Sequence, residues 1–351
     1  MRIPPLASLL VLLCAGCAGV GARTVTADRF DYTSALSDSW KREMLINIVK
    51  VRYGDAPIFL DVSSVIESYE LVQSVSVGGL WQNNSVSTTG VTLGANGAFA
   101  NRPTISYSPI SGDKFAKAFM TPVPPHVVLG LIQSGYPADT VFRVLVQSVN
   151  GVSNRRSSQA TPQPASAEFA ELAHGIRDLQ TSGTIDLRVT KTEKGESQLV
   201  VMRTELDPTQ AAESKRLRKI LGLDPGANEF ALVYGRLPAN DHQIALITRS
   251  MMQVLIDYAS FIDVPPIDVT EHRVGPSVAE PPVHGLPYIR IQSGPAKPQD
   301  AFVTVPYRNH WFWIDDRDFG SKELFSFLLS MFTLVNIGDK QAAPVLSLPL
   351  R

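Results

Sequence analysis

Apolar residues recur with a helical period along much of this 351-residue chain. Between residues 37 and 53 they come every three or four positions, and charged residues fill the positions between them, which predicts an amphipathic helix. Asp207, Pro208 and Gln210 form a helix-start signal, since Asp and Gln cap each other and Pro suits the first turn. The same reasoning predicts helices at residues 37–53, 114–120, 126–133, 138–149, 166–180, 208–222, 249–262 and 321–335.

Short runs rich in β-branched residues predict strands between these helices. Consecutive strands are separated by short turns, which favours antiparallel pairing with helices on one face, an α+β fold. We expect two subdomains after a signal peptide. The predicted strands are residues 58–77, 104–107, 185–189, 198–203, 229–234, 243–247, 288–291, 302–305 and 311–314.

Two polar segments indicate the domain organisation. Residues 78–102 are rich in Gly, Ser, Thr and Asn, which predicts a mobile, hairpin-like excursion from the first domain. Residues 152–165 have little to bury and predict a linker between domains 32–151 and 166–351. We expect trypsin to cut this linker first, at Arg155 or Arg156. Asn150 and Gly151, just before the linker, suit a left-handed cap on the helix at 138–149.

The first 16 residues have the three parts of a secretory signal: Arg2, an apolar run and small residues. The run ends in Leu-Leu-Cys-Ala-Gly-Cys, which resembles a bacterial lipobox with Cys14 in place of the usual Leu. The resemblance implies cleavage before Cys17, diacylglycerol on its thiol and acylation of its amine, which together anchor a protein durably in a membrane. Ala18 replaces the Asp that retains lipoproteins in the inner membrane, so the periplasmic face of the outer membrane is favoured. An ordinary signal peptide is the alternative.

Composition supports an exported, globular chain. The two cysteines are Cys14 and Cys17, so lipidation and cleavage leave no free thiol and no disulfide. Their C-x-x-C spacing lacks the folded context that a redox or zinc motif needs. The net charge of −1 gives no basic field for nucleic acid. We therefore expect residues 17–31 to form a lipidated tether to the membrane, followed by a globular body.

Four stretches resemble those of a group of hypothetical proteobacterial lipoproteins that has no assigned activity. They are MLINIVKVRYGD at 44–55, TISYSP at 104–109, VQSVNG at 146–151 and WFWIDDRD at 311–318. The resemblance covers most of the mature chain. It implies an envelope location and carries no mechanism.

The last of these stretches holds the residues with most chemical potential. Asp315, Asp316 and Asp318 are the densest acidic cluster, and paired carboxylates bind cations or act as acid and base. The alternative is a turn in which Asp318 or Ser321 caps the last helix. Trp311 and Trp313 alternate around Phe312, so one face of this strand belongs to the core and the other is a candidate sugar- or peptide-binding surface.

The remaining motifs exclude several activities. Asp318-Phe319-Gly320 matches a kinase triplet without the other kinase motifs, and the six histidines lack the spacing of a helical zinc pair. We expect no metal and no cofactor. The leading hypothesis is a lipoprotein that binds or scaffolds an envelope protein or the cell wall, without catalysis. The alternatives are a hydrolase using His310 with Asp315, Asp316 and Asp318, and an accessory subunit of a secretion or transport assembly.

Overall fold

The computed structural model describes residues 20–66, 69–80, 90–101, 104–156, 163–192, 195–203, 207–277 and 288–336. Helices and both antiparallel and mixed sheets are present, so the predicted α+β class is confirmed. The chain forms two compact units. Unit 1 comprises residues 1–57 and 113–339, and unit 2 contains the intervening residues 58–112. Cys17 lies outside the described residues.

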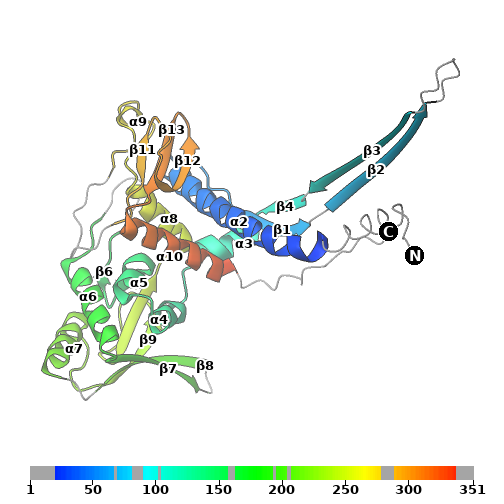
Figure 1. Ribbon diagram of the computed structural model, residues 1–351. Coiled ribbons are helices and arrows are strands. Elements are labelled where there is room, and N and C mark those ends of the chain that lie inside the picture. The colour runs from blue at the N-terminus through cyan, green and yellow to red at the C-terminus, as the bar shows by residue number, and fades with distance from the viewer. Residues whose placement is uncertain are drawn as a thin grey trace, which may run out of the picture. The chain divides into compact units, whose positions relative to one another are not determined.

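Unit 1 contains a mixed six-stranded sheet in the order β6-β5-β10-β9-β8-β7. Strands β9 and β10 are parallel, and the other neighbours are antiparallel. The strands are β5 (Val146–Val149), β6 (Val152–Ser153), β7 (Ile185–Thr192), β8 (Gly195–Met202), β9 (Glu229–Tyr234) and β10 (Gln243–Thr248). Four helices accompany them: α4 (Pro125–Gln133), α5 (Ala138–Leu145), α6 (Ala167–Thr181) and α7 (Pro208–Leu221) (Figure 1).

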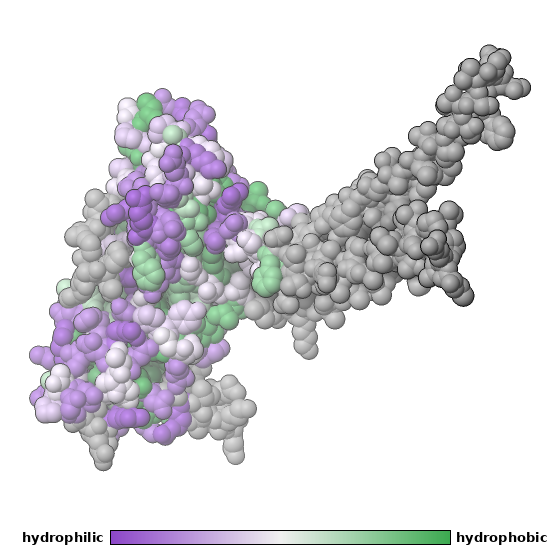
Figure 2. Space-filling model, in the orientation of Figure 1, coloured by the Kyte–Doolittle hydropathy of each residue, from purple (hydrophilic) through white to green (hydrophobic). Residues whose placement is uncertain are grey.

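A second, three-stranded sheet in unit 1 has the order β11-β13-β12. Its strands are β11 (Gln292–Gly294), β12 (Ala301–Tyr307) and β13 (His310–Asp315). Helix α2 (Val20–Arg52) packs on β12 and on α8 (Met251–Ser260), and α10 (Phe319–Asn336) contacts α2. The turns between these elements include α3 (Gly112–Phe115), the π-helix η2 (Ala116–Met120) and α9 (Pro266–Thr270). In Figure 2 the visible surface around this sheet is mainly hydrophilic.

The core of unit 1 is built from the apolar stripes that predicted its helices. Leu45 and Ile48 of α2, Leu172 of α6, Leu217 of α7 and Phe325 of α10 are almost wholly buried. The helix-start signal at Asp207 is confirmed as a capping box, and α7 ends at Gly222, whose φ of 64° is left-handed. No helix in the described part of the chain is long and apolar enough to cross a bilayer.

Unit 2 consists of two antiparallel ladders. Strand β1 (Leu60–Ile66) pairs with β4 (Thr104–Pro109), and β2 (Tyr69–Leu80) pairs with β3 (Gly90–Asn101). The glycine-rich segment predicted as a hairpin-like excursion at 78–102 is therefore part of a longer hairpin. It begins at Tyr69, because the Val and Leu residues before Gly78 continue the same ladder.

Helix α2 starts at Val20, whereas the sequence predicted a tether at 17–31 and a helix from residue 37. Residues 23–52 contain neither Gly nor Pro, so nothing in them interrupts a helix once its C-terminal half is packed. The polarity of the first turns, which suggested a tether, is equally compatible with a helix that has little to bury.

The helix predicted at 138–149 is wrong beyond Leu145. Residues Val146–Val149 form strand β5, which is buried along its whole length beside β10. Asn150 and Gly151 do take left-handed φ values, of 46° and 87°. Instead of capping a helix, they form a two-residue turn between Val149 and Val152. Asn-Gly is a preferred pair for such hairpins, because both turn positions need positive φ.

The domain boundary predicted at 152–165 falls inside unit 1. Strand β6 joins the same sheet as strands from beyond that segment. Asn154 and Arg155 are buried. The Arg155 side chain is only 2% exposed, and it is the largest of the fully buried side chains in the described residues. The expectation that Arg155 is accessible to trypsin is therefore wrong, whereas Arg156 is exposed. The polar composition of this segment predicts exposure to solvent, but Asn154 and Arg155 have their hydrogen-bond and ion-pair partners inside the fold.

Candidate functional site

Strand β13 places the predicted aromatic residues on its two faces. Phe312 and Ile314 are wholly buried, whereas Trp311 and Trp313 on the opposite face are half-buried. Gly294 of β11 lies beneath Trp313, and a Cβ there would come within 3.3 Å of the indole ring. The ammonium group of Lys297 is 5.6 Å from the ring centre of Trp311. The two tryptophans therefore form a partly open aromatic surface, here called the Trp face, on a sheet that fixes their position.

The acidic cluster after β13 builds the start of α10. Asp318 is its N-cap: one carboxylate oxygen accepts the Ser321 amide at 3.1 Å, and the other accepts the Ser321 hydroxyl at 2.8 Å. Ser321 is buried, and its hydroxyl oxygen also accepts the Arg290 amide at 2.8 Å. The capping interpretation of the sequence applies to Asp318, and this network ties α10 to the segment before β11.

The other two aspartates also have local partners. Asp315 accepts the Arg317 amide at 2.8 Å, and Asp316 pairs with Lys322 at 2.9 Å. The described residues contain no group of three His, Cys, Asp or Glu side chains placed to hold a metal ion. The three carboxylates thus take part in a turn and a helix start.

His310 and Asp315 stand at opposite ends of β13. Five residues of strand separate their Cα atoms by about 16 Å, and positions an odd number apart belong to opposite faces. The hydrolase alternative needs the imidazole and a carboxylate within hydrogen-bond reach of one substrate. The strand does not bring this pair together.

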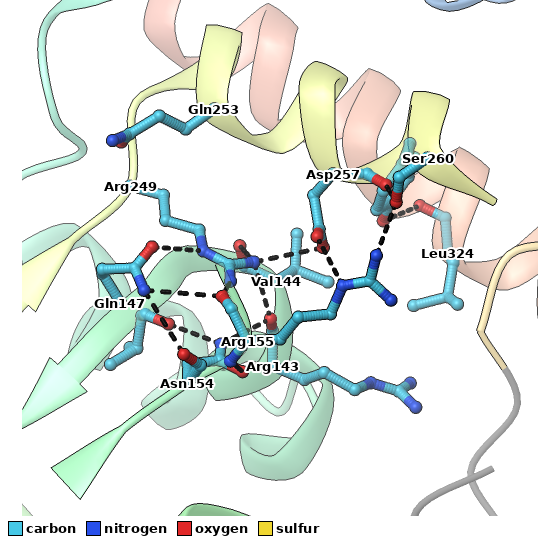
Figure 3. Close-up of polar contacts among 12 residues, drawn as sticks. Arg143, Val144, Gln147, Asn154, Arg155, Arg249, Gln253, Asp257, Ser260 and Leu324 are labelled. Carbon is cyan, nitrogen blue, oxygen red and sulfur yellow. Dashed lines mark hydrogen bonds and ion pairs between the residues drawn. The ribbon is translucent and has the colours of Figure 1, made fainter. Parts of the chain in front are cut away.

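A second polar site surrounds Arg155 and Asp257 (Figure 3). The Arg155 Nε lies 3.2 Å from Asp257 Oδ1, and Arg155 Nη2 donates to the Ser260 hydroxyl at 2.6 Å. Arg249 Nη1 lies 3.3 Å from Asp257 Oδ2. One carboxylate of α8 therefore pairs with two buried guanidinium groups, one from the segment after β6 and one from the end of β10.

Backbone carbonyls and amides complete this arrangement. Arg249 donates to Gln147 Oε1 at 3.2 Å, to the Arg143 carbonyl at 3.2 Å and to the Arg155 carbonyl. The Asn154 amide group donates to the Arg143 and Val146 carbonyls, at 3.0 and 2.6 Å. Burial lowers the pKa of the Arg249 guanidinium, and Asp257 opposes that shift. These bonds join α5, β5 and α8.

The Arg155 guanidinium also covers aromatic rings. It lies 3.9 Å from the ring centre of Phe261, which stacks on Tyr288 at 4.5 Å. A pocket with a volume of about 50 Å³ opens beside it, walled mainly by apolar side chains of α6, α8 and α10 together with Asp139 and Arg143. That volume holds a few water molecules. Among the described residues, Asp139 Oδ1 has no hydrogen-bond partner, so the pocket offers one acceptor to a small donor.

Little in the sequence indicates the Arg155 cluster. Its members come from four segments, and each sits among residues that looked ordinary for a loop or a helix surface. One signal is available: Asp257 is a charged residue on the predicted helix at 249–262, close to the apolar residues Leu255, Ile256 and Ala259. A charge so placed needs a buried partner.

Comparison with known proteins found no matching family model, no matching curated protein and no matching solved structure.

Proposed function

We propose that this protein is a lipid-anchored protein of the periplasmic face of the outer membrane, which binds or scaffolds an envelope protein or the cell wall and performs no catalysis. The lipobox-like sequence ending at Cys17 supports the anchor. Acyl chains supply nearly all the membrane affinity of such a protein, and two or more of them hold it durably.

The Trp face is the observation that carries the binding role. Tryptophan dominates the energetics of many binding surfaces, because it offers a large, rigid apolar area with one hydrogen-bond donor. Trp311 and Trp313 remain partly accessible while the opposite face of β13 fills the core. The neighbouring aspartates are engaged in the turn and the cap, which favours binding over acid–base chemistry at this end of the strand.

Fractionation of cells tests the anchor. Replacement Cys17→Ser removes the lipidated thiol, so we expect the variant to be released into the soluble fraction or to keep its signal peptide. A variant that is processed and still tightly bound to membranes would contradict lipidation at Cys17.

Cross-linking in intact cells tests the binding surface separately. A photoreactive residue at position 311 is compared with the same residue at Trp40, an exposed tryptophan of α2. We expect a discrete cross-linked product from position 311 that is weaker or missing from position 40. Equal products from both positions, or none from position 311, would contradict a role for the Trp face.

A further inference from the structure

The β2–β3 hairpin of unit 2 has a composition unlike the rest of the chain. Residues 71–101 contain no Asp, Glu, Lys or Arg, although 19% of all residues are charged. Glu70 and Arg102 border this stretch on either side. Hairpins in water normally carry charges on their exposed face and edges, which prevents them from associating. A charge-free hairpin of this length suits an environment other than water.

The register of the hairpin sorts its residues by polarity. Alternate positions of a strand belong to the same face of its ladder. One face holds the pairs Leu71–Phe99, Val75–Ala95 and Val77–Leu93, with Gln73–Gly97 among them. The other holds Ser74–Asn96, Ser76–Gly94 and Gly78–Thr92, with Val72–Ala98 and Leu80–Gly90 towards its two ends. Over the central positions 74–78, one face is thus apolar and the other small and polar. This dyad pattern over about ten residues is typical of strands that separate lipid from a polar interior.

The length of the strands matches a bilayer. Strands β2 and β3 each have 12 residues. At about 3.4 Å per residue they extend for about 40 Å, and a tilt of about 45° reduces this to about 29 Å, close to the ~30 Å of a hydrocarbon core.

From these three observations we propose that the β2–β3 hairpin inserts into a lipid bilayer with its Leu71, Val75, Val77, Leu93 and Phe99 positions facing the acyl chains. The insertion is a second membrane contact, separate from the proposed lipid on Cys17. It would make the protein a membrane-embedded component of an envelope assembly.

The two outer edges of the hairpin need hydrogen-bond partners inside the bilayer. In the described part of the chain, β2 and β3 form a sheet of two strands, so each has an outer edge of backbone groups outside this ladder. Such groups cost several kcal/mol each when left unpaired in hydrocarbon. The inserted hairpin therefore pairs edge to edge with the hairpins of other copies of this chain.

The cysteine content of the chain allows a direct test. Cys14 and Cys17 are the two cysteines of the chain, so the double replacement Cys14→Ser and Cys17→Ser gives a full-length chain without cysteine or acylated thiol, whether or not the signal peptide is removed. Single cysteines at Val75 or Val77 are matched by controls at Ser74 or Ser76, the adjacent positions of the opposite face. Each carries an environment-sensitive fluorophore, and the protein is reconstituted into vesicles of phosphatidylethanolamine and phosphatidylglycerol with or without a brominated lipid.

We expect the fluorophore at positions 75 and 77 to show a blue-shifted emission and quenching by the brominated lipid. At positions 74 and 76 it should show neither effect. Equal signals at all four positions, or no quenching anywhere, would overturn the proposal. An alternating blue shift without lipid quenching would also overturn it, since that result assigns the apolar face to a protein partner. Because these variants lack the acylated cysteine, failure here leaves the lipid anchor untouched, and failure of the anchor leaves this test valid.

Discussion

Asp257 of helix α8 holds Arg155 through an ion pair of 3.2 Å, although the two residues are about a hundred positions apart and both are buried. The opposite oxygen of the same carboxylate holds Arg249 at 3.3 Å. Buried pairs of this kind gain little over an apolar core, yet they are costly to break, because the partner charge remains in a low-dielectric environment.

We therefore expect Asp257→Ala to lower the free energy of unfolding by about 3–5 kcal/mol. That is a large share of the roughly 5–15 kcal/mol that stabilises a typical domain. Urea unfolding followed by circular dichroism measures the loss. The control is Asp300→Ala, which removes the exposed pair with Arg317 and should cost about 0–1 kcal/mol. Equal losses of unfolding free energy from the two substitutions would show that the buried pair stabilises the fold no more than the exposed one.

The same ion pair predicts the protease sensitivity of the segment after β6. In the folded protein, trypsin should leave the bond after Arg155 intact, because its side chain is only 2% exposed and cannot enter the specificity pocket of the protease. Mass spectrometry of a brief digest identifies the cut sites, and unfolded protein is the control. Early cleavage after Arg155 in native conditions would contradict the buried placement.

Phe312 should be the most sensitive residue of β13. Its side chain is wholly buried and meets the Tyr53 ring edge-on, with 6.0 Å between ring centres. Phe312→Ala should lower the free energy of unfolding by about 3–5 kcal/mol. Trp313→Ala removes a half-buried side chain and should cost less, as measured by urea unfolding of both variants. A larger loss from Trp313→Ala would place the core on the other face.

The different contacts of the aspartates at the start of α10 predict that their substitutions lower the free energy of unfolding by different amounts. Asp318→Ala removes the cap and should cost about 0.5–2 kcal/mol, whereas Asp318→Asn keeps an accepting oxygen and should cost less. Asp316→Ala breaks a surface pair with Lys322 and should cost about 0–1 kcal/mol. Thermal unfolding of the three variants orders them. Asp316→Ala as the most damaging would indicate a role beyond the turn.

Tyr53 predicts how stability changes in alkali. Burial, and then the hydrogen bond of 2.6 Å to Asp268, raise the pKa of its phenol well above the usual value. The unfolded chain releases this proton from about pH 10, while the folded chain keeps it. The unfolded state then binds fewer protons, so stability is fully present below pH 10 and falls as the pH rises towards the folded pKa.

Replacement of Tyr53 by Phe tests this dependence. The variant loses a hydrogen bond and is less stable at every pH, but its free energy of unfolding should decline less between pH 9 and about pH 11 than that of the unmodified protein. Urea unfolding at several pH values measures the two slopes. Equal slopes would mean that Tyr53 does not contribute to alkaline sensitivity.

Periodicity predicted most of the elements of unit 1 because their apolar stripes meet the core directly, as in α6 and α10. Capping chemistry located the start of α7 for a similarly local reason. The prediction failed where distant partners decide the outcome. Val146–Val149 continues a helical pattern but becomes a strand because β10 pairs with it. Arg155 looks solvated but is buried, because its Nε pairs with Asp257 and its Nη2 donates to Ser260.

The candidate site shows the same limit. Alternation around Phe312 correctly separated two faces of β13, yet it did not reveal which face is core. That choice depends on a residue from far along the chain, since Tyr53, directly after α2, packs edge-on against Phe312. The envelope location and the lipid on Cys17 stay predictions.

The two segments of unit 1 lie far apart in the sequence, and this separation has a consequence for the order of folding. Helix α2 is made early, but one of its packing partners, β12, begins at Ala301. About 250 residues must therefore be synthesised before this contact can close, and contacts of such long range form slowly because chain entropy opposes them. Until its final fifth emerges, the chain remains without a complete first unit. If the predicted signal peptide directs export, this delay keeps the chain unfolded during its passage through the membrane.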